Sequence, residues 1–236
     1  DETGAFEGCV WGDLNGDGAA DIIIGAPNDD DLTLGLKNTG SVTAYTITQY
    51  ELLREYGAVT NANLGASVAS ADVNNDGFSD VLAGAPADDD ITNGRKDTGS
   101  ITIFFGNDAL PQVKKYGVVA KANLGNSVAA GDVDGDGKAD LIAGAWRDDK
   151  TGVSKAVKDA GSVCVWSGDD YASIATFYGD LAKDYFGFAV SAGDINADGH
   201  GDLIIGIPGF DAVSPNKIKD SGAVQVVSGA ALAHSP

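Results

Sequence analysis

The stretch Asp13-Leu14-Asn15-Gly16-Asp17-Gly18-Ala19-Ala20-Asp21 runs directly into the apolar segment Ile22-Ile23-Ile24-Gly25-Ala26. Positions 1, 3, 5 and 9 of this loop carry three carboxylates and one amide, and a glycine at position 6 allows a sharp turn. Such a set of oxygen atoms suits a hard cation. We therefore predict that the loop binds Ca²⁺.

The same loop occurs three more times, at intervals of about 60 residues. Counting the first copy, the candidate side-chain ligands are Asp13, Asn15, Asp17 and Asp21; Asp72, Asn74, Asp76 and Asp80; Asp132, Asp134, Asp136 and Asp140; and Asp194, Asn196, Asp198 and Asp202. A turn rich in Asp, Asn and Gly that binds no metal is the alternative. It is less favoured, because turn formation alone does not require carboxylates at positions 5 and 9 in four copies.

Position 12 of each loop distinguishes it from an EF-hand, which has a bidentate glutamate there on a helix. Here that position holds Ile24, Ala83, Ala143 or Ile205. Each loop is followed instead by a short apolar run, which is typical of a strand buried on both faces. The predicted cation loop therefore joins two strands.

Composition supports an all-β protein built from short strands and many turns, since 33 of the 236 residues are Gly and only 6 are Pro. The formal net charge of −20 argues against binding to nucleic acid or to an anionic membrane surface. Up to four Ca²⁺ ions would offset part of this charge. There is no apolar run long enough to insert into a membrane, and a chain that begins at Asp1 and lacks Met is expected to be a processed or excised segment. We predict an extracellular, secreted or cell-surface location, where calcium is abundant enough to fill weak sites.

Each of the first three repeats contains four expected strands, and the last repeat contains the first three of them. The first precedes the cation loop, the second follows it, the third begins with Gly-Ser or Gly-Ala, and the fourth ends in Tyr-Gly in the first three repeats. Four strands in 60 residues are typical of a propeller blade. We predict one β-propeller domain over residues 1–236, with four blades at approximately 1–57, 58–117, 118–179 and 180–236.

Phe186-Gly187 before the fourth loop, with Gly25-Ala26-Pro27 and Gly84-Ala85-Pro86 after the first two, resembles the FG-GAP repeat of the N-terminal propeller of integrin α subunits. The resemblance implies calcium between the first two strands of each blade, and recognition of a protein or glycan instead of catalysis. It also implies four backbone carbonyl ligands, at Ala19, Phe78, Lys138 and His200. The chain departs from the family in having Leu64-Gly65 and Leu124-Gly125 in place of Phe-Gly, and four repeats where the family propeller has seven.

We expect an adhesion or assembly module and no enzyme, because the two histidines, His200 and His234, offer no paired catalytic base. A carbohydrate-active propeller enzyme and a lectin are the alternatives. Trp146 and Tyr185 are possible glycan contacts, although packing is the simpler interpretation. The two cysteines, Cys9 and Cys164, are expected to be free and buried.

The loops at 28–39, 87–98, 147–160 and 209–221 are long for hairpins, and each contains a lysine before the third strand: Lys37, Lys96, Lys158 and Lys219. In an up-and-down blade these four loops lie at the opposite end from the cation loops. The family resemblance implies a ligand site on the face that the four loops form. Solvated turns with local Lys and Asp pairs are an equally good interpretation.

The last repeat lacks a clear fourth strand, so the ring has two possible forms. A closed ring of four blades, with a three-stranded last blade, is slightly favoured. The alternative is an open arc completed by a second copy or by a longer parent chain.

Overall fold

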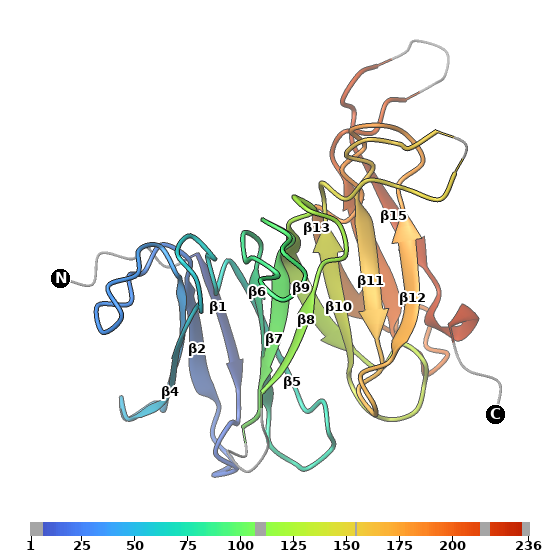
Figure 1. The fold of residues 1–236 in the computed structure, drawn as a ribbon. Coiled ribbons are helices and arrows are strands. Elements are labelled where there is room, and N and C mark those ends of the chain that lie inside the picture. Colours follow the sequence, from blue (N-terminus) through green and yellow to red (C-terminus); the bar gives the residue numbers. More distant parts are fainter. Residues whose placement is uncertain (1–6, 107–111, 154, 213–217, 233–236) are drawn as a thin grey trace.

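A computed structural model describes residues 7–106, 112–153, 155–212 and 218–232. The chain forms antiparallel sheets in which successive strands are neighbours (Figure 1). The first sheet contains β1 (Gly8–Gly12), β2 (Asp21–Ala26), β3 (Ser41–Tyr45) and β4 (Glu51–Tyr56). The second contains β5 (Ser67–Ala71), β6 (Asp80–Ala85), β7 (Ser100–Phe104) and β8 (Val113–Tyr116). The third contains β9 (Leu124–Gly131), β10 (Asp140–Ala145), β11 (Ser162–Trp166) and β12 (Ser173–Tyr178).

The fourth sheet has three strands within the described residues: β13 (Ala189–Gly193), β14 (Asp202–Ile207) and β15 (Ala223–Val227). A short 3₁₀ turn, Gly229–Ala231, follows β15. The predicted all-β architecture of four blades is confirmed. Within the described ranges, no helix is long and apolar enough to cross a lipid bilayer.

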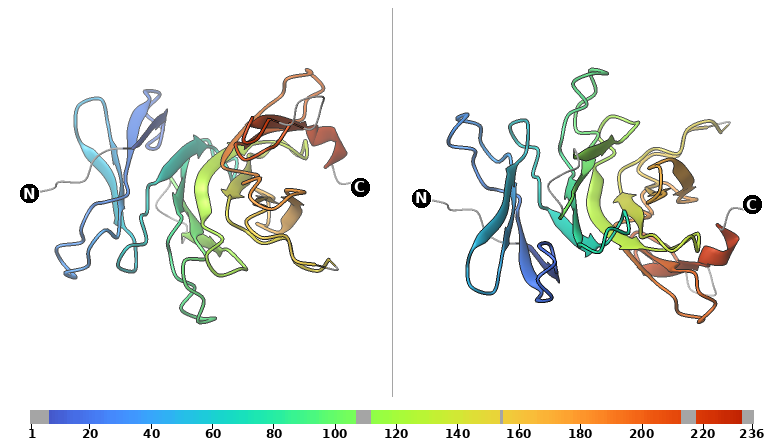
Figure 2. Two further views of the ribbon diagram at one scale, coloured as in Figure 1. Left: turned by 90° about the horizontal axis from the view of Figure 1, so that it is seen from above. Right: turned by 90° about the horizontal axis from the view of Figure 1, so that it is seen from below.

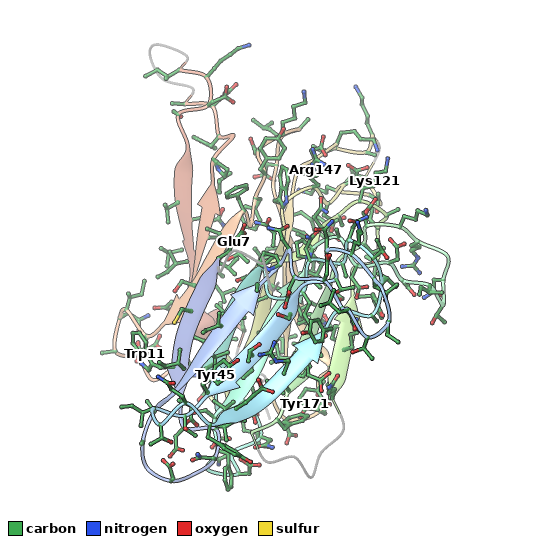
Figure 3. All side chains as sticks on the ribbon, turned by 90° about the vertical axis from the view of Figure 1, so that its left-hand side faces the viewer. Glu7, Trp11, Tyr45, Lys121, Arg147 and Tyr171 are labelled. Carbon is green, nitrogen blue, oxygen red and sulfur yellow. The ribbon has the colours of Figure 1, made fainter. Side chains whose placement is uncertain are left out.

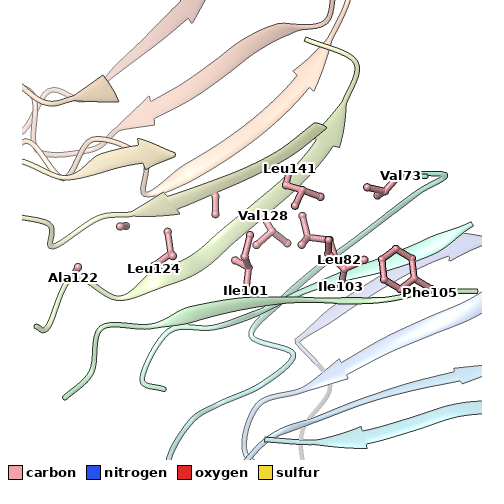
Figure 4. Packing of buried hydrophobic residues seen from close by; sticks show 11 residues of the cluster. Val73, Leu82, Ile101, Ile103, Phe105, Ala122, Leu124, Val128 and Leu141 are labelled. Carbon is pink, nitrogen blue, oxygen red and sulfur yellow. The ribbon is translucent and has the colours of Figure 1, made fainter. Parts of the chain in front are cut away.

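The blades pack face to face, and this explains the apolar runs that follow the cation loops. Every residue of β6 and β10 is buried, because each of these strands belongs to a blade that has another blade packed on each of its two faces. Between the second and third blades, Ile101 and Ile103 of β7 pack with Leu124, Val128 and Leu141 (Figure 4). Similar clusters join the first blade to the second and the third to the fourth. Hydrophobic burial between blades therefore holds the repeats together.

The glycines of the Phe-Gly and Gly-Ala-Pro patterns meet where consecutive blades touch. A Cβ on Gly25 would overlap the backbone of Gly65, and one on Gly84 would overlap Gly125. Gly144 and Gly187 repeat this contact one blade later. These glycines allow backbones to approach more closely than any side chain would permit.

The four blades form an open arc (Figures 1 and 2). The inner strands contact one another in chain order, β1 with β5, β5 with β9 and β9 with β13. The first and last blades lie at opposite ends of the molecule in both views of Figure 2. The arrangement is thus the open alternative, and the preference for a closed four-bladed ring was wrong. The inter-blade packing sets a rotation per blade that is too small for four blades to close.

Both cysteines are free thiols, as predicted, but their burial differs from the prediction. Cys9 is exposed on β1, because β1 faces the open inner side of the arc. Cys164 is partly buried on β11, and burial raises the pKa of its thiol to about 11. The prediction that Cys9 is buried was wrong, because alternate side chains of β1 are exposed and Cys9 is one of them.

Candidate metal centre

The four candidate cation loops connect β1 to β2, β5 to β6, β9 to β10 and β13 to β14, so they lie at the same end of their blades. At position 1 of the first loop, Asp13 Oδ1 accepts a hydrogen bond from the Asp17 N–H at 3.1 Å, and Oδ2 accepts one from the Gly18 N–H at 2.9 Å. The second and fourth loops repeat both bonds. These bonds turn the loop inward around its own carboxylates.

Oxygen atoms from positions 1, 3 and 5 converge in this conformation. In the third loop, carboxylate oxygens of Asp132, Asp134 and Asp136 all lie within 4.8 Å of one another. The other loops have Asn at position 3, which supplies an amide oxygen in place of a third clustered carboxylate. In the first loop, Asn15 Oδ1 accepts from the Asp17 N–H at 2.9 Å, and its amide donates to Asp17 Oδ2 at 3.1 Å. Carboxylate and amide oxygens are the donor set that Ca²⁺ prefers, so these residues fit calcium.

The aspartate at position 9 has a second task that the sequence interpretation missed. Asp21, Asp80, Asp140 and Asp202 are buried, and each accepts a hydrogen bond through Oδ2 from the N–H at position 2, at 2.8 to 3.1 Å. In the last three repeats, Oδ1 also accepts from a glycine N–H that follows the third strand, at Gly106, Gly168 and Gly229. The recurring glycine after the third strand was the available signal for this clamp. Burial raises the pKa of both Asp80 and Asp140 to about 6, and the backbone hydrogen bonds oppose this shift.

The residues predicted to offer backbone carbonyls occupy equivalent positions. The N–H groups of Ala19, Phe78, Lys138 and His200 each donate to the carboxylate at position 5 of their own loop, at 2.8 to 3.0 Å. Their roles as metal ligands remain predictions.

Loops of neighbouring blades also touch. The Ser79 N–H donates to the Asp13 carbonyl at 2.8 Å, and the Gly201 N–H donates to the Asp132 carbonyl at 2.6 Å. The Phe78 ring lies against Gly16, where an added Cβ would be 2.7 Å away. The candidate sites of the first and second blades, and those of the third and fourth, are therefore joined by direct contacts.

The loops after the second strands lie at the opposite end of each blade and are ordered by a repeated hydrogen-bond pattern. Asp29 Oδ2 accepts from the Ser41 hydroxyl at 2.8 Å, and the next residue, Asp30, accepts from the Asn38 N–H at 2.7 Å. The second and third blades repeat both bonds. Of the predicted lysines, Lys158 pairs with Asp149 of its own loop. The acidic residues in these loops thus serve mainly to shape them.

Exposed aliphatic side chains at the tips of these loops went unnoticed in the sequence. They are Leu32, Leu34, Ile91, Val153 and Ile218. Figure 3 shows side chains projecting from this end of the blades, near the labelled Arg147 and Lys121.

An aromatic group lies at the same end, between the third and fourth blades. Trp146 packs edge-on against Tyr185 and Phe188, with ring centroids 5.3 and 5.7 Å apart. The Arg147 guanidinium lies 4.5 Å from the centre of the Trp146 ring. Packing accounts for these contacts, and Phe188 remains partly exposed.

Comparison with known proteins agrees with the repeat structure. The FG-GAP repeat profile matches residues 64–104, 124–166 and 186–227, and an FG-GAP-like repeat profile matches residues 13–83. Integrin alpha-V of Gallus gallus is 38% identical over 104 residues, which cover 44% of this chain and 9% of the integrin. Integrin alpha-PS2 of Drosophila melanogaster is 27% identical over 235 residues, covering 91% of this chain and 16% of the integrin. The chain thus spans only a small part of the length of these relatives.

The solved structures with a similar fold include rhamnogalacturonan lyases, which are enzymes. Rhamnogalacturonan lyase YesW superposes with a TM-score of 0.53 and 16% identity, over 95% of this chain and 42% of the lyase. A Bacillus licheniformis rhamnogalacturonan lyase superposes with a TM-score of 0.52 and 15% identity, over 84% of this chain and 39% of the lyase. Identity this low indicates a shared fold alone. Because this fold occurs in enzymes, however, the firm expectation that the chain is not an enzyme is overturned. The absence of a paired histidine was too narrow a criterion, because catalysis can use other side chains.

The integrin relatives and the repeat profile, which covers more than half of the sequence, identify the family: the chain belongs to the FG-GAP repeat family.

Proposed function

We propose that this integrin-like propeller is a calcium-stabilised module that binds a protein or glycan outside the cell, in adhesion or assembly. The observation that carries the proposal is the fourfold convergence of carboxylate and amide oxygens at one end of the blades. Clustered carboxylates repel one another, and a divalent cation would offset that repulsion. Up to four Ca²⁺ ions would hold the loops rigid, leaving the opposite end available to a ligand.

The exposed aliphatic tips support the choice of the opposite end as the ligand face. Leu32 is 73% exposed and Ile91 is 71% exposed, and both project from loops held by buried hydrogen bonds. Apolar side chains presented on ordered loops favour contact with a protein surface. The integrin relatives make a protein ligand the first class to test.

Affinity capture from extracellular fluid, with and without a calcium chelator, tests this function. The variant Leu32→Ser/Ile91→Ser should lose the calcium-dependent partner. Ile47→Ser is the matched control, because Ile47 is 77% exposed but lies at the cation-loop end. A partner lost with Ile47→Ser but retained by the tip variant would place the ligand at the wrong end for this proposal. Light scattering of the same samples would reveal self-assembly.

A polysaccharide is the second candidate ligand. The partly exposed aromatic group of Trp146, Tyr185 and Phe188, with Arg147 beside it, favours this class, because sugar rings stack on aromatic side chains. A glycan array with Trp146→Phe as the variant would test it. Turnover of a bound polysaccharide, measured on the same array hits, would distinguish a carbohydrate-active enzyme from a lectin.

A further inference from the structure

A cavity of about 230 Å³ lies between the second and third blades, away from the cation loops. The third blade contributes Asp148, Ser162, Cys164, Thr176 and Tyr178 to its lining. The second blade contributes Lys115, Tyr116 and several apolar residues. Asp148 is only 4% exposed, so the cavity contains a buried carboxyl group.

The equivalent carboxylate in the second blade shows how the chain itself can pair such a group with a cation. Asp88 is 1% exposed, and it accepts a hydrogen bond from the Ser100 hydroxyl at 2.6 Å. The Lys114 ammonium forms an ion pair with Asp88 Oδ2 at 2.6 Å. The same ammonium lies 5.2 Å from the centre of the Tyr116 ring. Asp88, Ser100 and Tyr116 therefore form an internal ammonium site that Lys114 occupies.

The third blade keeps the serine and the tyrosine of this site, but it lacks the ammonium and the hydrogen bond that the Asp89 N–H donates to Asp88 Oδ1 at 3.0 Å. Strand register matches Ser162 and Tyr178 to Ser100 and Tyr116, and it puts Thr176 at the place of Lys114. The Ser162 hydroxyl donates to Asp148 Oδ2 at 2.7 Å, as Ser100 does to Asp88. Asp148 Oδ1 is buried and makes no hydrogen bond of ordinary geometry within the described residues, although the Asp149 N–H lies near enough to lower the pKa of Asp148 slightly against the effect of burial.

We propose that this cavity binds an alkylammonium group, with Asp148 as counter-ion and the Tyr178 ring as a cation–π contact. A buried carboxylate is costly unless it is paired, and a primary ammonium would restore the pairing that the second blade achieves internally. Tyr116, Val118 and Ser173 are exposed residues of the lining and leave the cavity a route to solvent. Burial raises the pKa of Asp148, and burial followed by the nearby Asp148 carboxyl raises the pKa of Tyr178. Both shifts agree with a carboxyl group that lacks its cation.

Lys115 is the competing cation, since it lines the same cavity from the second blade. No ion pair joins Lys115 to Asp148 among the described residues. Lys115 lies on β8 of the second blade, whereas the position equivalent to Lys114 is Thr176, on β12 of the third blade. The equivalent carboxylate is absent from the fourth blade, where Phe210 follows the second strand. The cavity between the third and fourth blades therefore has Phe210 at the place of Asp148, and its own carboxyl groups, Asp180, Asp184 and Asp211, come from other positions.

Thermal unfolding with n-butylammonium, at constant ionic strength against NaCl, tests the site. The wild type should gain melting temperature with butylammonium, and Asp148→Asn should lose that gain. Tetramethylammonium, which cannot donate a hydrogen bond, should give a smaller shift. An equal shift in wild type and Asp148→Asn, or no shift at all, would overturn the proposal. So would a shift that disappears in Lys115→Gln but persists in Asp148→Asn.

The variant Thr176→Lys supplies the ammonium from the chain itself. It should raise the melting temperature without added amine and remove the response to butylammonium. The reverse change, Lys114→Thr, should lower the melting temperature and create a second site at which butylammonium restores stability. If Thr176→Lys destabilised the protein and Lys114→Thr showed no rescue, the equivalence of the two blades would be refuted.

The source of the ammonium is distinguished by a further probe, Nα-acetyl-lysine methylamide. Binding at least as tight as that of butylammonium would indicate a lysine side chain from a protein, whereas rejection of the lysine derivative with retention of butylammonium would indicate a free amine. Crosspeaks of Thr176 and Tyr178 in NMR titrations should move with either probe. Movement confined to residues outside the cavity would contradict the assignment.

Discussion

At the scale of a single residue, Gly125 near the start of β9 allows the second and third blades to approach closely. Gly125 has φ of +87°, and an added Cβ would overlap the Ser100 carbonyl and lie 3.0 Å from Gly84 Cα. Both neighbours are backbone atoms, so a side chain could be accommodated only by separating two blades.

We expect Gly125→Ala to destabilise the protein more than Gly94→Ala. Gly94 also has a positive φ, of +65°, but nothing lies within 4 Å of its added Cβ. Both variants incur the cost of a left-handed conformation, and Gly125→Ala adds an overpacking cost of about 1–3 kcal/mol. Urea unfolding would measure the difference. Equal losses of stability would show that the blades separate without cost.

The proposed metal ligands also make a prediction at the residue scale. Asp136→Ala should remove part of the stability gained on adding Ca²⁺, by about 2.7 kcal/mol at a calcium concentration 100-fold above the dissociation constant. For a chain of this size that corresponds to roughly 5–10 °C in melting temperature. Calorimetry with and without chelator would measure it.

The control for Asp136→Ala has to be a carboxylate that does not support the fold. Asp89 is unsuitable, because its Oδ1 accepts a hydrogen bond from the Asp97 N–H at 2.8 Å. Asp180 is suitable, since its side chain is 90% exposed and its one ion pair within the described part of the chain is with Lys150 at the surface. If Asp180→Ala and Asp136→Ala lowered the calcium-dependent gain equally, the ligand assignment would be wrong.

At the scale of one element, we predict that the loop after β10 makes the stability of the protein depend on pH. Burial raises the pKa of Asp148 above its ordinary value of 3.8, so the folded chain binds this proton more tightly than the unfolded chain. The contribution of Asp148 to stability is therefore present below pH 3.8 and is lost as pH rises through the raised pKa. Asp149 and Lys158 pair beside it, while Lys115, Cys164 and Tyr178 line its cavity.

Asp148→Asn remains uncharged at every pH, so its stability relative to wild type should increase between about pH 4 and pH 8. Urea unfolding of both proteins at these two pH values, under the same calcium concentration, would test this. The cation loops titrate alike in both proteins and cancel from the comparison. A constant difference would show that Asp148 has an ordinary pKa.

The arc makes a prediction at the scale of the whole molecule. Cys9 is exposed on the inner strand of the first blade, whereas Cys164 lies in the cavity between two packed blades. In the native protein, one thiol should react quickly with a disulfide reagent and the other slowly, because the pKa of Cys164 is raised to about 11. Cys9→Ser should abolish the fast reaction. Two slow thiols in the wild type would indicate that the inner strands are covered.

The sequence by itself determined the repeat, the order of strands in each blade and the clustering of Asp13, Asn15 and Asp17 with their counterparts. These features are local: a nine-residue loop and short apolar runs encode them without reference to distant residues. The recurring Tyr-Gly pairs also marked the ends of the first three blades, although the partners of these residues were not visible in the sequence.

Only the tertiary structure decided that the blades form an arc, that Cys9 is exposed and that Asp148 is buried without the ammonium that Asp88 has. Each depends on contacts between different strands or blades, such as Gly84 with Gly125 or β8 with β7. The rotation between blades comes from the packing of whole sheets, and the pairing of a buried carboxylate comes from the strand beside it. The rotation is not encoded in one repeat alone, because it arises from side-chain volumes and backbone approach across the interface. Asp88 and Lys114 belong to the same repeat, but only the pairing of β8 with β7 brings the lysine beside the carboxylate.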